Sequence, residues 1–357
     1  MHRVLILGGT ALVAGMIFAA ATLLLSHPVR SNALETVTPS TAVASAAVAS
    51  VFLAPADTST PTMVPTSTPV PATDTPVPPT ATPTAAAPVK TGSAAPPNVQ
   101  AESIAVIDEG SGALLYGRNP HEHLAPASVT KIYTALVALK YGKLNQQIHV
   151  QFDQSQLSDS TLMGLKEGDT FTLEDLLYGL MLPSGNDAAL AIANAIGGNE
   201  THFVDMMNVQ AQELGLHDSH FVNPHGLDAP GHYTSAYDLG MAARYGMTHY
   251  PEFRTLASTV KHDVHGSRSF TVWNLNRFLW SYPGADGVKI GYTDNAGKTI
   301  VASATRNGHR VYVVLLHCGD IVNDSVPLFN WVFSNYTWPA NAPLSAGVTP
   351  TPAPTPK

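Results

Sequence analysis

The sequence Ser128-Val129-Thr130-Lys131 lies in a segment, residues 126–139, whose apolar residues repeat at helical spacing. Residues three apart on a helix share a face, so the Ser128 hydroxyl and the Lys131 amine are expected to lie side by side. A serine hydroxyl is a weak nucleophile that an adjacent base activates. Lysine can be that base when burial and nearby positive charge lower its pKa. The pair therefore predicts nucleophilic catalysis by Ser128 with Lys131 as the base.

A second Ser-x-x-Lys sequence, Ser258-Thr259-Val260-Lys261, is not expected to share this chemistry. From Val260 onward, apolar and polar residues alternate as in a β-strand. Positions three apart on a strand point to opposite faces, which would separate the hydroxyl from the amine. We therefore assign the nucleophile to Ser128.

The sequence Ser184-Gly185-Asn186 supplies two further polar side chains. It lies in a short turn between two expected helices, residues 172–182 and 187–196. Turns of this kind often present polar side chains to a cleft. Taken alone, the sequence fits equally well with Asn186 capping the second helix.

The sequence Lys289-Ile290-Gly291 would add a fixed positive charge on a strand that its glycines allow a ligand backbone to approach. The pattern Lys-x-Gly is common by itself. A literal Lys90-Thr91-Gly92 also occurs, but it lies in a proline-rich stretch where no strand is expected.

The elements that must position these groups are strands near both ends of the central region and helices between them. Two turns, 109–112 and 306–309, each separate a pair of apolar runs and predict hairpins. Thr172 begins a helix-capping sequence, and helices are expected at about 172–182, 187–196, 201–214, 235–247 and 323–336. This order predicts an α/β fold of the α+β type, with an antiparallel sheet from both chain ends flanked by a helical subdomain.

The composition divides the 357 residues into four parts. Residues 1–28 contain an uncharged apolar stretch, 4–25, about 33 Å long as a helix, which fits a membrane anchor or a signal peptide. Residues 29–98 and 341–357 are rich in proline, threonine and alanine and are expected to be disordered, the first as a tether. Residues 99–340 form the expected catalytic domain, and the leader predicts an extracytoplasmic location.

The charge and the metal-binding residue types exclude several classes of protein. The net charge of −8 disfavours nucleic acid as a partner. The single cysteine, Cys318, excludes an intrachain disulfide and fits a buried core thiol. Two histidine-rich sequences, 121–123 and 217–220, lack the His-Glu-x-x-His spacing of a zinc peptidase. No metal and no cofactor is predicted.

Together, the order and spacing of the three motifs resemble those of the penicillin-recognising serine acyl-transferases. Within that group the sequence is most similar to the serine D-alanyl-D-alanine carboxypeptidases, the low-molecular-mass penicillin-binding proteins. The resemblance covers about residues 100–319 and includes the segments 126–131, 184–189, 223–227 and 286–293. It implies the fold of serine β-lactamases and DD-peptidases. It also implies an enzyme that trims peptidoglycan stem peptides through an acyl-enzyme and is inhibited by β-lactams.

The resemblance implies a role for each catalytic residue. Ser128 would be acylated, and Lys131 would be its general base. Ser184 would relay a proton between the base and the leaving amine. Asn186 would hold Lys131 and the substrate amide, and Lys289 would supply electrostatic stabilisation.

The implied substrate-binding residues are Arg277, Ile290, Gly291, Tyr292 and Thr293. The backbone N–H of Tyr292 would form the oxyanion hole together with that of the nucleophile. Arg277 would hold the terminal carboxylate of the substrate. The family usually has threonine where Ile290 stands, so the hydroxyl that normally contacts this carboxylate is missing.

Two other functions stay open. A β-lactamase shares the fold and the first motif but must activate water for deacylation, in one class through a glutamate on a dedicated loop. The corresponding Glu-x-x-Leu-Asn sequence does not occur here. A non-catalytic cell-wall or penicillin-binding module is the other alternative, although such a module needs no pair of nucleophile and base.

Overall fold

The computed structural model describes residues 85–152, 157 and 160–347. All of them belong to one compact unit, residues 77–357. The expected membrane anchor, residues 4–25, lies outside the described residues. Within the described ranges, no helix combines the length and the apolar character needed to cross a membrane.

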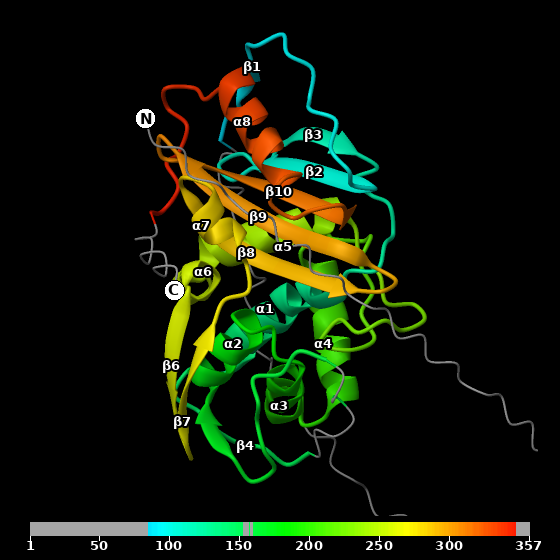
Figure 1. Ribbon diagram of the computed structural model, residues 1–357, viewed down its shortest axis with the longest axis vertical. Coiled ribbons are helices and arrows are strands. Elements are labelled where there is room, and N and C mark those ends of the chain that lie inside the picture. The colour runs from blue at the N-terminus through cyan, green and yellow to red at the C-terminus, as the bar shows by residue number, and fades with distance from the viewer. Residues whose placement is uncertain (1–84, 153–156, 158–159, 348–357) are drawn as a thin grey trace, which may run out of the picture. The chain divides into compact units, whose positions relative to one another are not determined.

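A five-stranded antiparallel sheet runs through this unit (Figure 1). The strand β10 pairs with β2 on one side and with β9 on the other, so the beginning and the end of the domain share one sheet. The expectation of a sheet built from both chain ends, with hairpins β2–β3 and β9–β10, is confirmed. The order across the sheet is β3 (Leu114–Arg118), β2 (Ser103–Asp108), β10 (His309–Cys318), β9 (Gly297–Arg306) and β8 (Ala285–Thr293).

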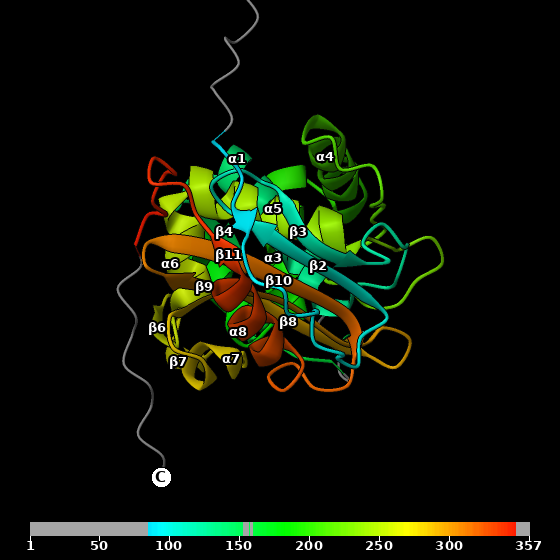
Figure 2. The ribbon, with the colours of Figure 1, turned by 90° about the horizontal axis from the view of Figure 1, so that it is seen from above.

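Alternate side chains of the sheet face two separate hydrophobic cores, as expected for strands covered on both faces. On β2, Ile104 and Val106 belong to the core that includes Phe329 of α8 (Ser325–Asn335). Ile107 of the same strand belongs to the larger core under the helices. Figure 2 shows α8 over β10. The short helix α7 (Phe278–Ser281) lies on the same face, because its Phe278 packs on Phe329, and the other helices lie on the opposite side of the sheet.

The helical subdomain lies between β3 and β8 in the sequence. The expected helices are present within two residues of their predicted bounds, and the Thr172 hydroxyl caps α2 by accepting a hydrogen bond from Asp175 N at 3.1 Å. The short pairs β4–β5 and β6–β7 lie outside the main sheet. The elements are η1 (Ala127–Thr130), α1 (Lys131–Tyr141), β4 (Gln147–His149), β5 (Thr170–Thr172), α2 (Leu173–Met181), α3 (Asn186–Gly197), α4 (Glu200–Glu213), α5 (Ala236–His249), α6 (Pro251–Ser258), β6 (Lys261–His265), β7 (Ser269–Trp273) and α7 (Phe278–Ser281).

The second Ser-x-x-Lys sequence falls where a helix gives way to a strand. Ser258 ends α6, and its hydroxyl donates to Arg254 O at 2.9 Å. Lys261 begins β6, and its Nζ lies 3.6 Å from Asp263 Oδ1. The two side chains therefore engage different partners, in agreement with the choice of Ser128.

The prediction that the disordered tether extends to residue 98 is wrong for residues 89–94. Val89 and Lys90 form strand β1, which pairs with β11 (Tyr336–Thr337), so a strand does form at the literal Lys90-Thr91-Gly92 sequence. The indole of Trp331 donates to Ala94 O at 3.0 Å. The proline-rich segment is ordered because α8 and β11 offer it backbone and aromatic partners that its own composition does not reveal.

The predicted disordered tail is likewise too long at its beginning. Ser345 N donates to Gly308 O at 2.7 Å, and Arg310 Nη2 donates to Ala346 O at 2.9 Å. Arg310 is fully buried and also binds Glu109 and Asp286. The start of the tail thus completes the hydrogen bonds of a buried arginine on β10.

Candidate active site

Ser128 lies in the single turn η1 that leads into α1. Thr130 Oγ1 donates to Ala127 O at 2.8 Å, and Thr299 Oγ1 of β9 donates to Pro126 O at 3.0 Å. Ala127 has a φ of 53°, a conformation that residues with a side chain rarely adopt. The turn is therefore fixed from both sides, and it holds Ser128 against the sheet.

Two glycines allow other segments to approach this turn. A Cβ on Gly226, whose φ is +92°, would lie 2.0 Å from Ala127 O. A Cβ on Gly291 of β8 would lie 2.7 Å from Ser128 N. Both approaches require glycine, which explains why the strand sequence Lys-x-Gly belongs to the site.

Lys131 is fully buried directly beside the nucleophile. Its Nζ lies 2.9 Å from Ser128 Oγ and donates to Asn186 Oδ1 and His225 O, both at 2.6 Å. Burial, with help from the nearby Lys289 amine, holds the pKa of Lys131 well below its ordinary value. A neutral amine at this distance can accept the hydroxyl proton.

Lys289 is the second buried amine of the site, with 1% of its surface exposed. It lies on β8, one of the two edge strands of the sheet, and its Nζ donates to Ile290 O at 3.1 Å. Burial lowers the pKa of Lys289 to about 7. The Lys289 amine, which was predicted to carry a fixed positive charge, is therefore only partly protonated at neutral pH.

Ser184 lies in the predicted turn between α2 and α3, and Asn186 is the first residue of α3. The alternative that Asn186 caps α3 is wrong, because the cap position is Gly185 and the Asn186 side chain binds Lys131. Ser184 has a φ of 64°. Its buried Oγ has no hydrogen-bond partner within the described part of the chain, and Ser184 lines the same cavity as Ser128.

Asp187 was not predicted to contribute, yet it organises one wall of the site. Its carboxylate accepts hydrogen bonds from Met163 N, Gly164 N and Leu165 N, all at 2.8 Å. The same loop brings Thr161, whose hydroxyl donates to Ser184 O at 2.8 Å. An acidic residue in the first turn of a helix ordinarily indicates an interaction with the helix dipole, so no local pattern predicts that Asp187 binds this loop.

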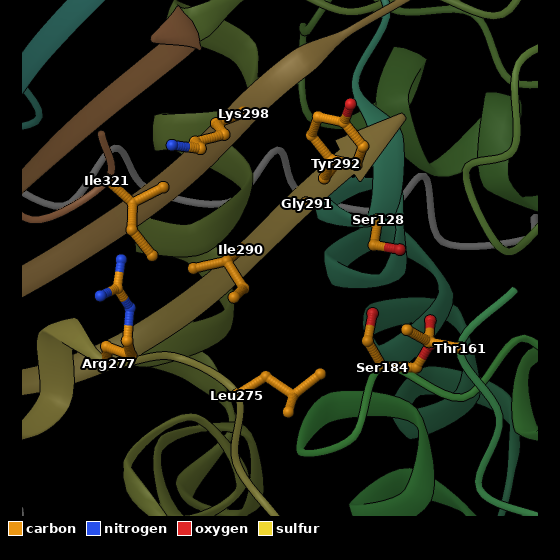
Figure 3. Close-up of a pocket in the computed structure, with 10 residues that line it drawn as sticks. All are labelled: Ser128, Thr161, Ser184, Leu275, Arg277, Ile290, Gly291, Tyr292, Lys298 and Ile321. Atoms are coloured by element: carbon orange, nitrogen blue, oxygen red, sulfur yellow. The ribbon is translucent and has the colours of Figure 1, made fainter. Parts of the chain in front are cut away.

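A cavity of about 350 Å³ opens beside Ser128. Figure 3 shows the hydroxyls of Ser128, Ser184 and Thr161 at one end, Ile290 and Leu275 in the middle, and Arg277, Ile321 and Lys298 at the other end. The predicted Arg277, Ile290, Gly291 and Tyr292 all line it, whereas Lys289 does not. Lys298 lines it without having been predicted, because a lysine on a strand next to a loop carries no distinguishing pattern.

A second depression lies on the other side of Ser128 and is lined by Asn186, Tyr292 and Thr293. The Thr293 hydroxyl donates to Asp228 Oδ1 at 2.8 Å. The Tyr292 side chain is 63% exposed, and its hydroxyl donates to Asp294 Oδ1 at 3.0 Å. Ser128 therefore borders both hollows.

The histidines considered for a zinc peptidase have other partners. His121 Nδ1 lies 2.7 Å from Asp218 Oδ2, and His220 Nδ1 lies 2.7 Å from Gly231 O. Among the residues that the structure describes, no cluster of three or more His, Cys, Asp or Glu could hold a metal ion.

Comparison with known proteins agrees with this geometry. A family model described as D-alanyl-D-alanine carboxypeptidase matches residues 90–319. The chain is 37% identical to D-alanyl-D-alanine carboxypeptidase DacF of Bacillus subtilis over 60% of this chain and 57% of that protein. It is 35% identical to DacD of Escherichia coli over 68% and 65%, respectively. The chain thus spans less than two thirds of the length of these two relatives.

Solved structures show the same fold. The DD-transpeptidase of Streptomyces K15 superimposes with a TM-score of 0.63 at 31% identity, over 68% of this chain and 100% of that one. Penicillin-binding protein 5 of Haemophilus influenzae gives a TM-score of 0.63 at 32% identity, over 68% and 73%. The predicted DD-peptidase-like fold is confirmed. The chain belongs to the D-alanyl-D-alanine carboxypeptidase family.

Proposed function

We propose that the protein is a serine-type D-alanyl-D-alanine carboxypeptidase that acts on peptidoglycan stem peptides and is acylated by β-lactams. The observation that carries the proposal is the fully buried Lys131 amine 2.9 Å from Ser128 Oγ. A buried lysine with a lowered pKa is costly to the fold and is typical of a catalytic base. The membership of the chain in the family supports the choice of substrate.

The proposed reaction has two steps. Ser128 Oγ attacks the carbonyl carbon between the two D-alanines while Lys131 takes its proton, and the N–H groups of Ser128 and Tyr292 stabilise the oxyanion. The C–N bond then breaks, and the proton passes through Lys131 and Ser184 to the leaving D-alanine amine. Water finally hydrolyses the ester and restores the Ser128 hydroxyl.

The two alternatives are less well supported. Burial of Lys131 and Lys289 lowers the stability of the fold. A non-catalytic binding module would gain nothing in return. For a β-lactamase, the site would need a water-activating carboxylate. Among the described residues, the cavity beside Ser128 is lined by the hydroxyls of Thr161 and Ser184 and by no carboxylate. Asp228 and Asp294 line the second depression, but each already accepts a hydrogen bond, from Thr293 and Tyr292 respectively.

The protein is further proposed to act outside the cytoplasm, held to the membrane by residues 4–25 or released by cleavage after them. The uncharged apolar stretch supports this location. Membrane fractionation of the full-length chain and N-terminal sequencing of the mature protein distinguish the two forms. A full-length chain recovered from the cytosol with residues 4–25 intact would contradict both.

Covalent labelling tests the proposed activity. A fluorescent penicillin should label the wild-type protein at Ser128, and mass spectrometry should detect loss of D-alanine from a muropeptide pentapeptide. Ser128→Ala should abolish both results. Ser258→Ala, which alters the second Ser-x-x-Lys sequence, is the matched control and should retain them. Labelling that persists in Ser128→Ala would refute the assignment.

A further inference from the structure

The imidazole of His232 contacts the turn that carries the nucleophile, although His232 and Thr130 are 102 positions apart in the chain. Only 6% of His232 is exposed. Its Nδ1 accepts a hydrogen bond from Val222 N at 3.1 Å, so the hydrogen of the neutral ring must lie on Nε2. Nε2 lies 2.9 Å from Thr130 Oγ1 and therefore donates to that hydroxyl.

The surroundings of His232 favour the neutral ring. Burial, with the nearby His220, lowers the pKa of His232 to about 4, and Asp228 opposes this shift only in part. A second ring hydrogen would have to lie on Nδ1, directly against the N–H of Val222. At neutral pH the ring thus has one acceptor and one donor, and both are engaged.

The hydrogen bond from His232 determines the direction of the Thr130 hydroxyl. A hydroxyl carries one hydrogen and can rotate, so a donor at one lone pair directs that hydrogen toward another acceptor. The acceptor here is Ala127 O, at 2.8 Å. Thr130 is fully buried, so bulk water does not compete for either bond.

The Ala127 carbonyl belongs to the same peptide group as the N–H of Ser128. Because a peptide group is planar, a hydrogen bond that holds the oxygen also fixes the direction of the N–H. Ala127 has a φ of 53°, a costly conformation that persists only where the surroundings enforce it. Two hydrogen bonds in series, through Thr130, thus connect His232 to the Ser128 N–H.

We propose that His232 is a positioning residue for the reaction at Ser128. It orients the Thr130 hydroxyl, which holds the Ala127–Ser128 peptide group so that the Ser128 N–H points at the developing oxyanion. Because the oxyanion is absent from the ground state, His232 should affect the chemical step and not the binding of substrate. The inference rests on the proposed function, since it uses the Ser128 N–H as an oxyanion donor.

Two substitutions separate the two hydrogen bonds of the ring. The amide of asparagine takes the place of Nδ1, so His232→Asn keeps the acceptor for Val222 N and loses the donor to Thr130. The amide of glutamine takes the place of Nε2, so His232→Gln keeps the donor to Thr130 and loses the acceptor. If His232 served only stability, His232→Gln would be the more harmful change, because it leaves a backbone N–H without its acceptor.

Rapid mixing with a fluorescent penicillin measures the acylation rate constant at saturation and the dissociation constant of the noncovalent complex. His232→Asn should lower the rate constant about tenfold through loss of one hydrogen bond and leave the dissociation constant unchanged. The loss stays below the 10²–10³-fold that removal of an oxyanion donor costs, because the Ser128 N–H is displaced and not removed. His232→Gln should retain a rate within about threefold of the wild type. The control is His202→Asn, a change of an exposed histidine on α4, which should match the wild type.

Variants of Thr130 test whether His232 acts through this hydroxyl. Thr130→Val removes the donor to Ala127 O and should itself slow acylation, whereas Thr130→Ser keeps the hydroxyl and should retain most of the rate. Addition of His232→Asn to Thr130→Val should cause no further loss, because the connection from the ring to Ser128 is already broken.

The outcomes separate the inference from the proposed function. If penicillin labels Ser128 and His232→Asn is acylated as fast as the wild type, the inference is wrong and the proposed function stands. Losses that multiply in the double variant, or a change confined to the dissociation constant or the melting temperature, would also overturn it. Should His232→Asn fail to fold, acylation of Thr130→Val at the wild-type rate would overturn it equally. If the wild-type protein takes up no label at Ser128, the proposed function itself fails.

Discussion

Replacement of Lys131 is the most direct test of how the site works. Lys131→Met keeps a long unbranched side chain in the buried position but removes the amine that lies 2.9 Å from Ser128 Oγ. Lys131→Arg keeps a cation but cannot act as a base, because arginine stays protonated. Both variants should fail in acylation, although they change the charge of the site in different ways.

The size of the loss follows from the role of the amine. A positioned general base contributes about 10²–10⁴-fold to a rate, so acylation should fall at least about a hundredfold, or about 2.7 kcal/mol of barrier. Lys131→Met also leaves Asn186 Oδ1 and His225 O without their donor. Unpaired buried acceptors cost about 1–3 kcal/mol each, so Lys131→Met should also have a lower melting temperature.

The pH dependence of acylation tests whether Lys131 acts as a neutral amine. Because the pKa of Lys131 in the folded protein lies well below its ordinary value, the amine is neutral above that lowered pKa and active as a base. Acylation of the wild type should therefore decrease as the pH falls through the lowered pKa of Lys131. Rapid-mixing measurements of the second-order rate constant with a fluorescent penicillin, from pH 5 to 9, provide the profile.

Substantial acylation by a variant that lacks the Lys131 amine would refute general-base catalysis by this residue. A folded Lys131→Met or Lys131→Arg protein that retains more than about a tenth of the wild-type rate, a loss below about 1.4 kcal/mol, does not use Lys131 as its base. A wild-type rate that increases on acidification would contradict the neutral amine. Thermal melts of each variant confirm that the comparison is between folded proteins.

The remaining predictions concern the neighbours of this pair and the end of the domain. Ile290→Thr should raise acylation by penicillin about tenfold, measured as a second-order rate constant, because the new hydroxyl can donate to the carboxylate; an unchanged rate would contradict this. Lys289→Met should raise the melting temperature at pH 6 and flatten the pH dependence of stability. The folded pKa of about 7 lies below the unfolded value of about 10.4, so wild-type stability rises with pH between the two. Gly291→Ala should abolish penicillin labelling while the protein stays folded by circular dichroism, since its Cβ would lie 2.7 Å from Ser128 N. Deletion of residues 85–98 should lower the melting temperature by about 5 °C through loss of β1 and its hydrogen bonds, and an unchanged melting temperature would show that the segment is dispensable.

Local patterns in the sequence were sufficient to predict the centre of the site. The spacing of Ser128 and Lys131 on one helical turn depends only on the repeat of the backbone, and the structure brings the two side chains within 2.9 Å. The hairpins and the turn that carries Ser184 were predictable for the same reason. Each is set by a few consecutive residues.

Contacts between distant segments were not predictable in this way. The carbonyl of His225, which accepts from Lys131, lies 94 residues away in the chain. Lys298 enters the cavity only because β9 pairs with β8. A single sequence carries no record of such pairings, and the same limit explains why the strand at Lys90 was missed, since its partner β11 is near the other end of the domain.

Several energetically costly features of the fold lie at the nucleophile. Two lysines are buried there, and Ala127 and Ser184 adopt a positive φ. Each of these features costs stability, and such costs persist where the surrounding structure enforces them for function. The positive charge of Lys289 adds to the burial of Lys131 in lowering the pKa of the base. Lys289→Met, which removes the buried amine, should therefore be more stable and a poorer enzyme. A purely structural role for that amine would not produce this combination.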